Sequence, residues 1–120
     1  MHETVRDLLQ MQNQFRIFHW QTKNYAAHKA LGKAYETLDG LVDTFVETAL
    51  GRKEASLCNG HMDITLFDIK ELDFCTAIDT YKMFLSDLSN KVQPCDTDLL
   101  NIRDEMLGVL NHTCYLLKLS

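Results

Sequence analysis

The chain has few of the features that break helices or hold a protein in a membrane. It contains one proline and five glycines among 120 residues. No run of about eighteen apolar residues could span a bilayer, and no basic segment followed by an apolar one opens the sequence. These absences predict a soluble, cytoplasmic protein with no membrane partner, built as a single domain over residues 1–120.

Positive charge is also scarce. Twelve lysines and arginines stand against seventeen acidic residues, which gives a formal net charge of −5. Basic residues form no cluster along the chain, whereas proteins that bind DNA by neutralising phosphates need one. The sequence therefore argues against DNA binding.

The cysteines form no CxxC pair of the kind found in redox motifs and structural zinc sites. Cys58, Cys75, Cys95 and Cys114 lie far apart in the sequence. In a cytoplasmic protein such cysteines are expected to stay reduced. Cys58 and His61 do form an isolated CxxH pattern, but this pattern would need two further ligands to hold zinc.

Four stretches place apolar residues at steps of three and four, the spacing of one helix face. They predict helices over about residues 3–21, from Asn24 to Gly51, and over about 67–90 and 97–118. Asn24 and either Asp96 or Thr97 are expected to cap the second and fourth helices. Residues 51 to about 66 lose the periodicity, which predicts a longer connection there. The predicted fold is all-α, a four-helix bundle.

One face of the second predicted helix is acidic. At 100° per residue a single sector beside the apolar stripe collects His28, Gly32, Glu36, Asp39, Gly40, Asp43 and Glu47. A solvated surface is the plain interpretation, although such a surface usually interleaves lysines one turn away. Glu36 and Asp39 could instead support a cation site or guide cations to it. The two glycines weaken a helix, so close approach of another helix would explain them.

Two pairs of side chains on these helices suit a metal ion. Asp43 and Glu47 are one turn apart and can converge on one cation, and carboxylates combined with imidazoles suit iron, manganese or zinc. His28 lies fifteen residues before Asp43, or roughly 22 Å along a helix, so it cannot join them. His19, near the end of the first helix, is expected to be level with His28. A two-fold dimer with antiparallel second helices would then bring each histidine pair onto the opposite carboxylate pair.

The motifs that carry these residues resemble a known family. His19-Trp20-Gln21-Thr22-Lys23, then His28, Asp43-Thr44-Phe45-Val46-Glu47 and Ala49-Leu50-Gly51 resemble Dps, the mini-ferritins of the ferritin-like superfamily. The resemblance covers residues 5–51 well and residues 98–119 more loosely.

This resemblance implies a ferritin-like four-helix bundle with a ferroxidase centre between two subunits. His19 and His28 of one chain and Asp43 and Glu47 of its partner would be the metal ligands and catalytic residues. Ferrous iron would be oxidised there by peroxide or oxygen, with zinc or manganese as substitutes, and the ferric product stored in a shell of twelve subunits. Trp20, a residue type more often found in a core, would lie beside the centre.

Three other interpretations remain open. A structural bundle could keep the dimer and hold zinc without oxidising anything. An adaptor could instead dock a partner helix on its surface and bind no metal. A di-iron site within one chain lacks its usual Glu-x-x-His pattern, because Glu105 and His112 are seven residues apart.

Overall fold

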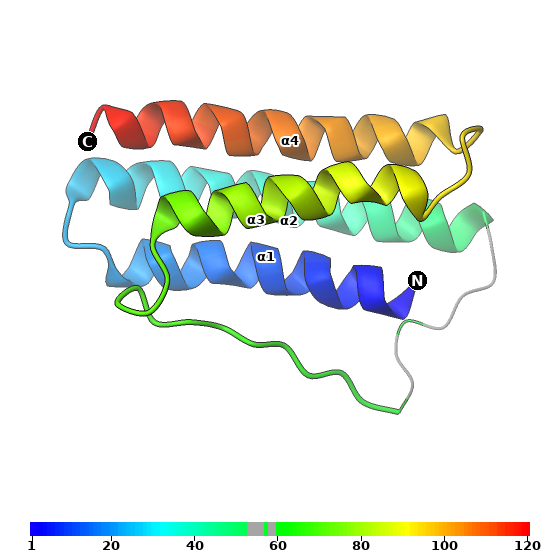
Figure 1. Cartoon of the computed structure of the whole chain (residues 1–120), viewed down its shortest axis with the longest axis horizontal. Coiled ribbons are helices and arrows are strands. Elements are labelled where there is room, and N and C mark those ends of the chain that lie inside the picture. The colour runs from blue at the N-terminus through cyan, green and yellow to red at the C-terminus, as the bar shows by residue number, and fades with distance from the viewer. Residues whose placement is uncertain (53–56, 58–59) are drawn as a thin grey trace.

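The computed structural model describes residues 1–52, 57 and 60–120. Four α-helices run lengthwise beside one another (Figure 1): α1 (His2–Gln21), α2 (Tyr25–Arg52), α3 (Phe74–Asp87) and α4 (Thr97–Lys118). A short 3-10 helix, η1 (Leu88–Asn90), follows α3, and the described residues include no β-strand. The all-α prediction is confirmed, and no helix in the described part of the chain is long and apolar enough to cross a membrane.

The predicted bounds of α1, α2 and α4 agree with the structure to within one or two residues. Asn24 caps α2 as expected, because its side-chain oxygen accepts a hydrogen bond of 2.8 Å from the amide of Ala27. Asp96 precedes α4, but its carboxylate makes no capping bond to the helix. It accepts instead from the amide of Gln93 and pairs with Arg52 at 2.8 Å.

The third helix was predicted to begin near residue 67, and this is wrong because α3 begins at Phe74. Asp68 accepts a hydrogen bond from the amide of Lys70, and this local turn competes with a helix. Asp73 then caps α3 by accepting from both the amide and the hydroxyl of Thr76. Short-range aspartate chemistry therefore sets the start of α3, although apolar periodicity continues upstream.

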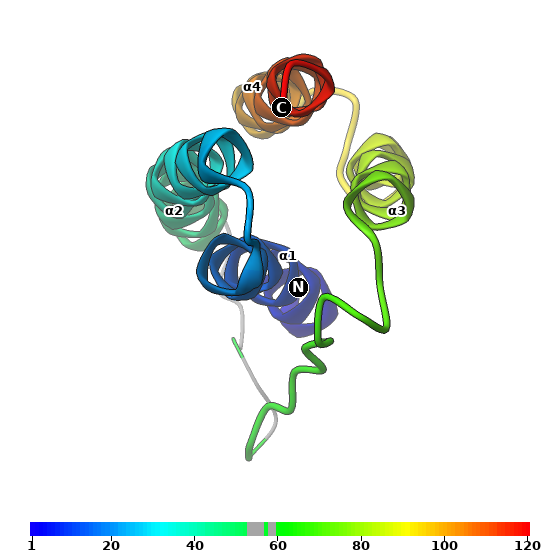
Figure 2. The same ribbon diagram turned by 90° about the vertical axis from the view of Figure 1, so that its left-hand side faces the viewer.

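Seen end on, the helices lie around a common axis (Figure 2), and all four contribute buried side chains to one core. Its largest fully buried side chains include Phe15, Phe18, Leu31, Phe45, Leu85 and Leu110. On α2 the buried residues follow the predicted apolar stripe, which leaves the acidic face toward solvent. Trp20 is not a core residue, because 65% of its surface is exposed.

Three glutamines of α1 hold the segment that precedes α3. Gln14 is fully buried; its side chain donates to the carbonyl of Phe67 and accepts from the amide of the same residue, both at 2.8 Å. Gln10 accepts from the amide of Thr65, and Gln21 accepts from that of Ile69. This glutamine row bonds alternate residues of the segment, much as a neighbouring strand would.

Three of the cysteines, Cys75, Cys95 and Cys114, are free thiols in the structure. Cys58, and with it the CxxH pattern, lies outside the described residues.

Candidate metal centre

His19 and His28 face each other across the tight connection between α1 and α2. Their imidazole rings stack with centroids 3.9 Å apart and planes 16° from parallel. His19 lies in the last turn of α1, and His28 lies in the first turns of α2. The expectation that the two histidines are level is confirmed.

Each histidine also bonds the backbone of the other. Nδ1 of His19 lies 2.7 Å from the carbonyl oxygen of His28, and Nδ1 of His28 lies 2.8 Å from that of His19. Because a carbonyl oxygen only accepts, each Nδ1 must carry the hydrogen. In the neutral form of each ring Nε2 is then the nitrogen that keeps its lone pair, and neither Nε2 has a hydrogen-bond partner among the described residues. A ring nitrogen fixed in this way is the usual arrangement of a metal-ligating histidine.

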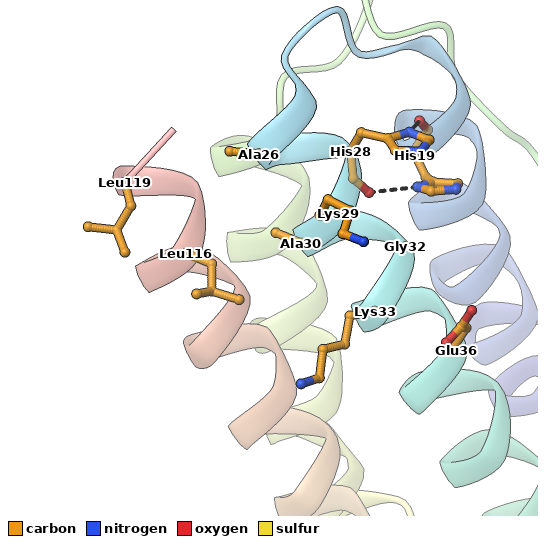
Figure 3. A pocket seen from close by; sticks show the side chains of 10 residues that line it. All are labelled: His19, Ala26, His28, Lys29, Ala30, Gly32, Lys33, Glu36, Leu116 and Leu119. Carbon is orange, nitrogen blue, oxygen red and sulfur yellow. Dashed lines mark hydrogen bonds between the residues drawn. The ribbon is translucent and has the colours of Figure 1, made fainter.

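A surface pocket of about 740 Å³ opens beside the stacked rings. Figure 3 shows the histidines on one side of this pocket, and on the other side Leu116 of α4 and Leu119, which follows the end of α4. Glu36 also lines it, two turns beyond His28 on α2. The pocket therefore combines two imidazoles, one carboxylate, two lysine side chains and an apolar wall.

Gly32 lies directly under the ring of His19. A Cβ atom added to this glycine would be 2.6 Å from Cε1 and 2.8 Å from Nδ1 of that ring. Close approach of another helix does explain this glycine, because the approaching group is the imidazole that α1 carries at position 19. Gly40 has nothing within 4 Å of its own added Cβ.

Asp43 and Glu47 form a second group on the exposed face of α2. Asp43 raises the pKa of Glu47 above its ordinary value, first through a side-chain hydrogen bond and then through charge repulsion. No lysine or arginine among the described residues makes an ion pair with either carboxylate. The two carboxyl groups are thus close enough to interact with each other.

The structure brings the four candidate residues together as two pairs and keeps the pairs apart. Helix α2 is continuous from Tyr25 to Arg52, so the fifteen residues from His28 to Asp43 span roughly 22 Å. Within the described part of one chain, no three side chains of the metal-ligating types are grouped around a common point. A site with all four ligands would require a second chain.

Aromatic residues of α1 and α2 make contacts that the apolar periodicity does not predict. The ring of Tyr25 stacks on His28 with centroids 6.3 Å apart. The guanidinium of Arg16 lies 4.2 Å from the ring centre of Tyr35 and 5.7 Å from that of Trp20. Two of these contacts have the spacing of neighbours on one helix face, three residues for Tyr25 and His28 and four for Arg16 and Trp20, whereas the contact of Arg16 with Tyr35 joins two helices.

Comparison with known proteins places the chain in a family. Residues 19–117 match a family of unknown function (DUF5856), and the chain belongs to it. The matched region contains His19, His28, Asp43 and Glu47. Searches of curated proteins and of solved structures found no significant match.

Proposed function

We propose that this family member is a Dps-like, ferritin-like bundle that binds ferrous iron between two copies of itself and oxidises it. The reciprocal hydrogen bonds of His19 and His28 are the observation that carries the proposal. Each Nδ1 hydrogen is donated to a carbonyl, so in the neutral rings Nε2 is the nitrogen that can ligate a cation. Imidazoles combined with carboxylates suit iron, with zinc or manganese as substitutes.

The carboxylates of the proposed site come from a partner chain. If two α2 helices pair antiparallel with His28 of one level with Asp43 and Glu47 of the other, the two-fold axis crosses near Glu36. The same two-fold operation completes two equivalent sites, which are separated from each other by about 22 Å along α2. Gly40 meets nothing within 4 Å of an added Cβ, which leaves room for a partner on this face.

The chemistry assigned to the site is electron transfer from ferrous iron. Each ferrous ion loses one electron, and hydrogen peroxide takes two electrons and two protons to give two waters. Asp43 and Glu47 stabilise the added positive charge of the ferric product, because their mutual repulsion is relieved by a cation. Storage of that product in a twelve-subunit shell extends the same proposal and would be seen as the mass of the assembly in solution.

The sharpest test mixes two inactive variants. One chain carries His19→Ala and His28→Ala, and the other carries Asp43→Ala and Glu47→Ala. Neither forms a complete site alone, but a mixed dimer has one complete and one empty site. Random reassociation of equal amounts should restore about a quarter of the wild-type sites, measured as ferric absorbance after ferrous iron and peroxide are added under anaerobic conditions.

A matched control replaces acidic residues outside α2. Asp79→Ala with Glu105→Ala removes two exposed carboxylates and should leave the oxidation rate unchanged. If the mixture stays inactive while wild type oxidises iron, the site is not shared between chains. If the Asp43 and Glu47 variant alone oxidises iron at the wild-type rate, the ligand assignment is wrong.

A zinc-holding bundle is the second candidate function, because zinc also accepts a histidine pair fixed by second hydrogen bonds. It keeps the same dimer and the same four ligands. Elemental analysis of protein purified without added metal separates the two: bound zinc without turnover of ferrous iron favours the structural role.

A further inference from the structure

We infer that Gly32 is a positioning residue for His19, needed for its imidazole to donate from Nδ1 to the His28 carbonyl and so keep Nε2 as the ligating nitrogen. This inference rests on the proposed function for its metal-binding consequence, but its geometric part concerns the metal-free chain. Sequence periodicity shows only that this glycine shares a helix face with His28. Its contact with the His19 ring comes from the structure.

The contact is too close for any side chain. An added Cβ would lie 2.6 Å from Cε1, 2.8 Å from Nδ1 and 3.4 Å from Nε2 of His19. Nδ1 is the atom that donates to the carbonyl of His28 at 2.7 Å. A methyl group at position 32 must therefore displace the ring at the atom that fixes its tautomer.

Helix geometry explains why residue 32 is the one concerned. In an α-helix the carbonyl of residue 28 already accepts the amide of residue 32, one turn later. A ring that reaches this carbonyl from α1 must pass beside the Cα of Gly32. Only glycine leaves space there while the His28 carbonyl serves both donors.

The ring of His19 cannot escape by a small movement in the other direction. It already stacks on His28 at 3.9 Å, and the Nδ1 of His28 holds the backbone of His19. A displaced ring loses the stacking and its own hydrogen bond together. Its hydrogen is then free to move between Nδ1 and Nε2, which removes one of the two ligands.

The test compares Gly32→Ala with Gly108→Ala, which lies in α4 and meets nothing within 4 Å. Both changes improve helix propensity equally, so they differ in the clash. Imidazole ¹⁵N chemical shifts of the metal-free chain should show Nδ1–H on both histidines in wild type and Gly108→Ala. In Gly32→Ala the His19 signature should be lost. Cobalt(II) affinity should fall roughly 10- to 100-fold in Gly32→Ala alone.

A second comparison covers the case in which Gly32→Ala folds poorly. If the methyl group that Gly32→Ala adds clashes with the imidazole of His19, removal of that ring should abolish the loss of stability that the clash causes. In a His19→Ala chain, Gly32→Ala should then raise the midpoint of thermal unfolding as Gly108→Ala does. The same increase with His19 present would overturn the inference.

The outcomes separate this inference from the proposed function. If Gly32→Ala alone loses the His19 signature but no chain binds cobalt, the positioning role stands and the metal-binding proposal fails. If wild type binds cobalt and Gly32→Ala keeps both the signature and the affinity, the positioning role fails and the metal site stands.

Discussion

Two pairs of acidic residues can be compared. One pair lies on α2 itself, and the other lies beside the end of α2, where it forms ion pairs with an arginine. Asp96 and Asp98 meet the guanidinium of Arg52 at 2.8 Å each, and this contact lowers the pKa of Asp98 below its ordinary value. Asp43 and Glu47 have no such partner among the described residues, and the pKa of Glu47 is raised. The pKa values of these two carboxyl groups, Asp98 and Glu47, are therefore shifted in opposite directions.

The difference teaches what each pair does for the fold. The Asp96 and Asp98 pair ties the end of α2 to the start of α4 through Arg52, so its charges are used within the chain. The Asp43 and Glu47 pair is exposed, and neither carboxylate makes an ion pair with a residue that the structure describes. It is therefore the pair that a metal ion or a partner chain would stabilise.

The largest expected effect is a change in the free energy of unfolding when one aspartate of each acidic pair is replaced. The sign of this change should differ between the two pairs. Asp96→Asn keeps an acceptor for the amide of Gln93 but removes a buried charge from Arg52, which should cost about 1–2 kcal/mol. Asp43→Asn relieves repulsion and should leave the metal-free chain equally or slightly more stable. Urea unfolding at pH 7 measures both. A loss of the same size in both variants would remove the distinction.

A smaller effect is expected on the titration of Glu47. Asp43→Asn removes the carboxyl group that shares a hydrogen bond with Glu47 and repels its charge, so the pKa of Glu47 should fall toward its ordinary value. Carboxyl ¹³C shifts followed against pH report this directly. Asp39→Asn is the control, because Asp39 accepts from Gln12 and lies two turns from Glu47. An unchanged Glu47 titration in Asp43→Asn would show that the pair is not coupled.

The smallest effect concerns acid unfolding. Because the folded pKa of Asp98 is lowered, its contribution is complete above its unfolded value, about 3.9, and is lost as pH falls through the folded pKa. Arg52→Gln should therefore make the loss of stability below about pH 4 shallower. Asp68 and Asp73 keep their lowered pKa values, so some acid sensitivity remains. A pH profile identical to wild type would contradict the role given to Arg52.

The sequence was sufficient to predict those features that depend on one helix and its ends. Apolar periodicity located α1, α2 and α4, and Asn24 was identified as a cap from its type and place. It also placed His19 and His28 at one level, because only three residues separate the two helices. These features depend on helical spacing and on the local chemistry of short polar side chains.

The sequence was insufficient where a result depends on how two segments meet. The exchange of hydrogen bonds between His19 and His28 needs the exact offset of α1 and α2, which periodicity does not give. The same holds for the contact of His19 with Gly32 and for the exposure of Trp20. The predicted start of α3 was wrong for another reason. The hydrogen bonds accepted by Asp68 and Asp73 outweighed the apolar pattern upstream of the helix.

The glutamine row has a consequence for how the length of this chain can vary. Gln10 and Gln14 are about 6 Å apart along α1, close to the spacing of the two alternate residues they hold, Thr65 and Phe67. Inserting one residue between Thr65 and Phe67 would turn one of the bonded amides to the opposite side. Changes in length are therefore better accommodated before Thr65 than within the segment that the glutamines hold.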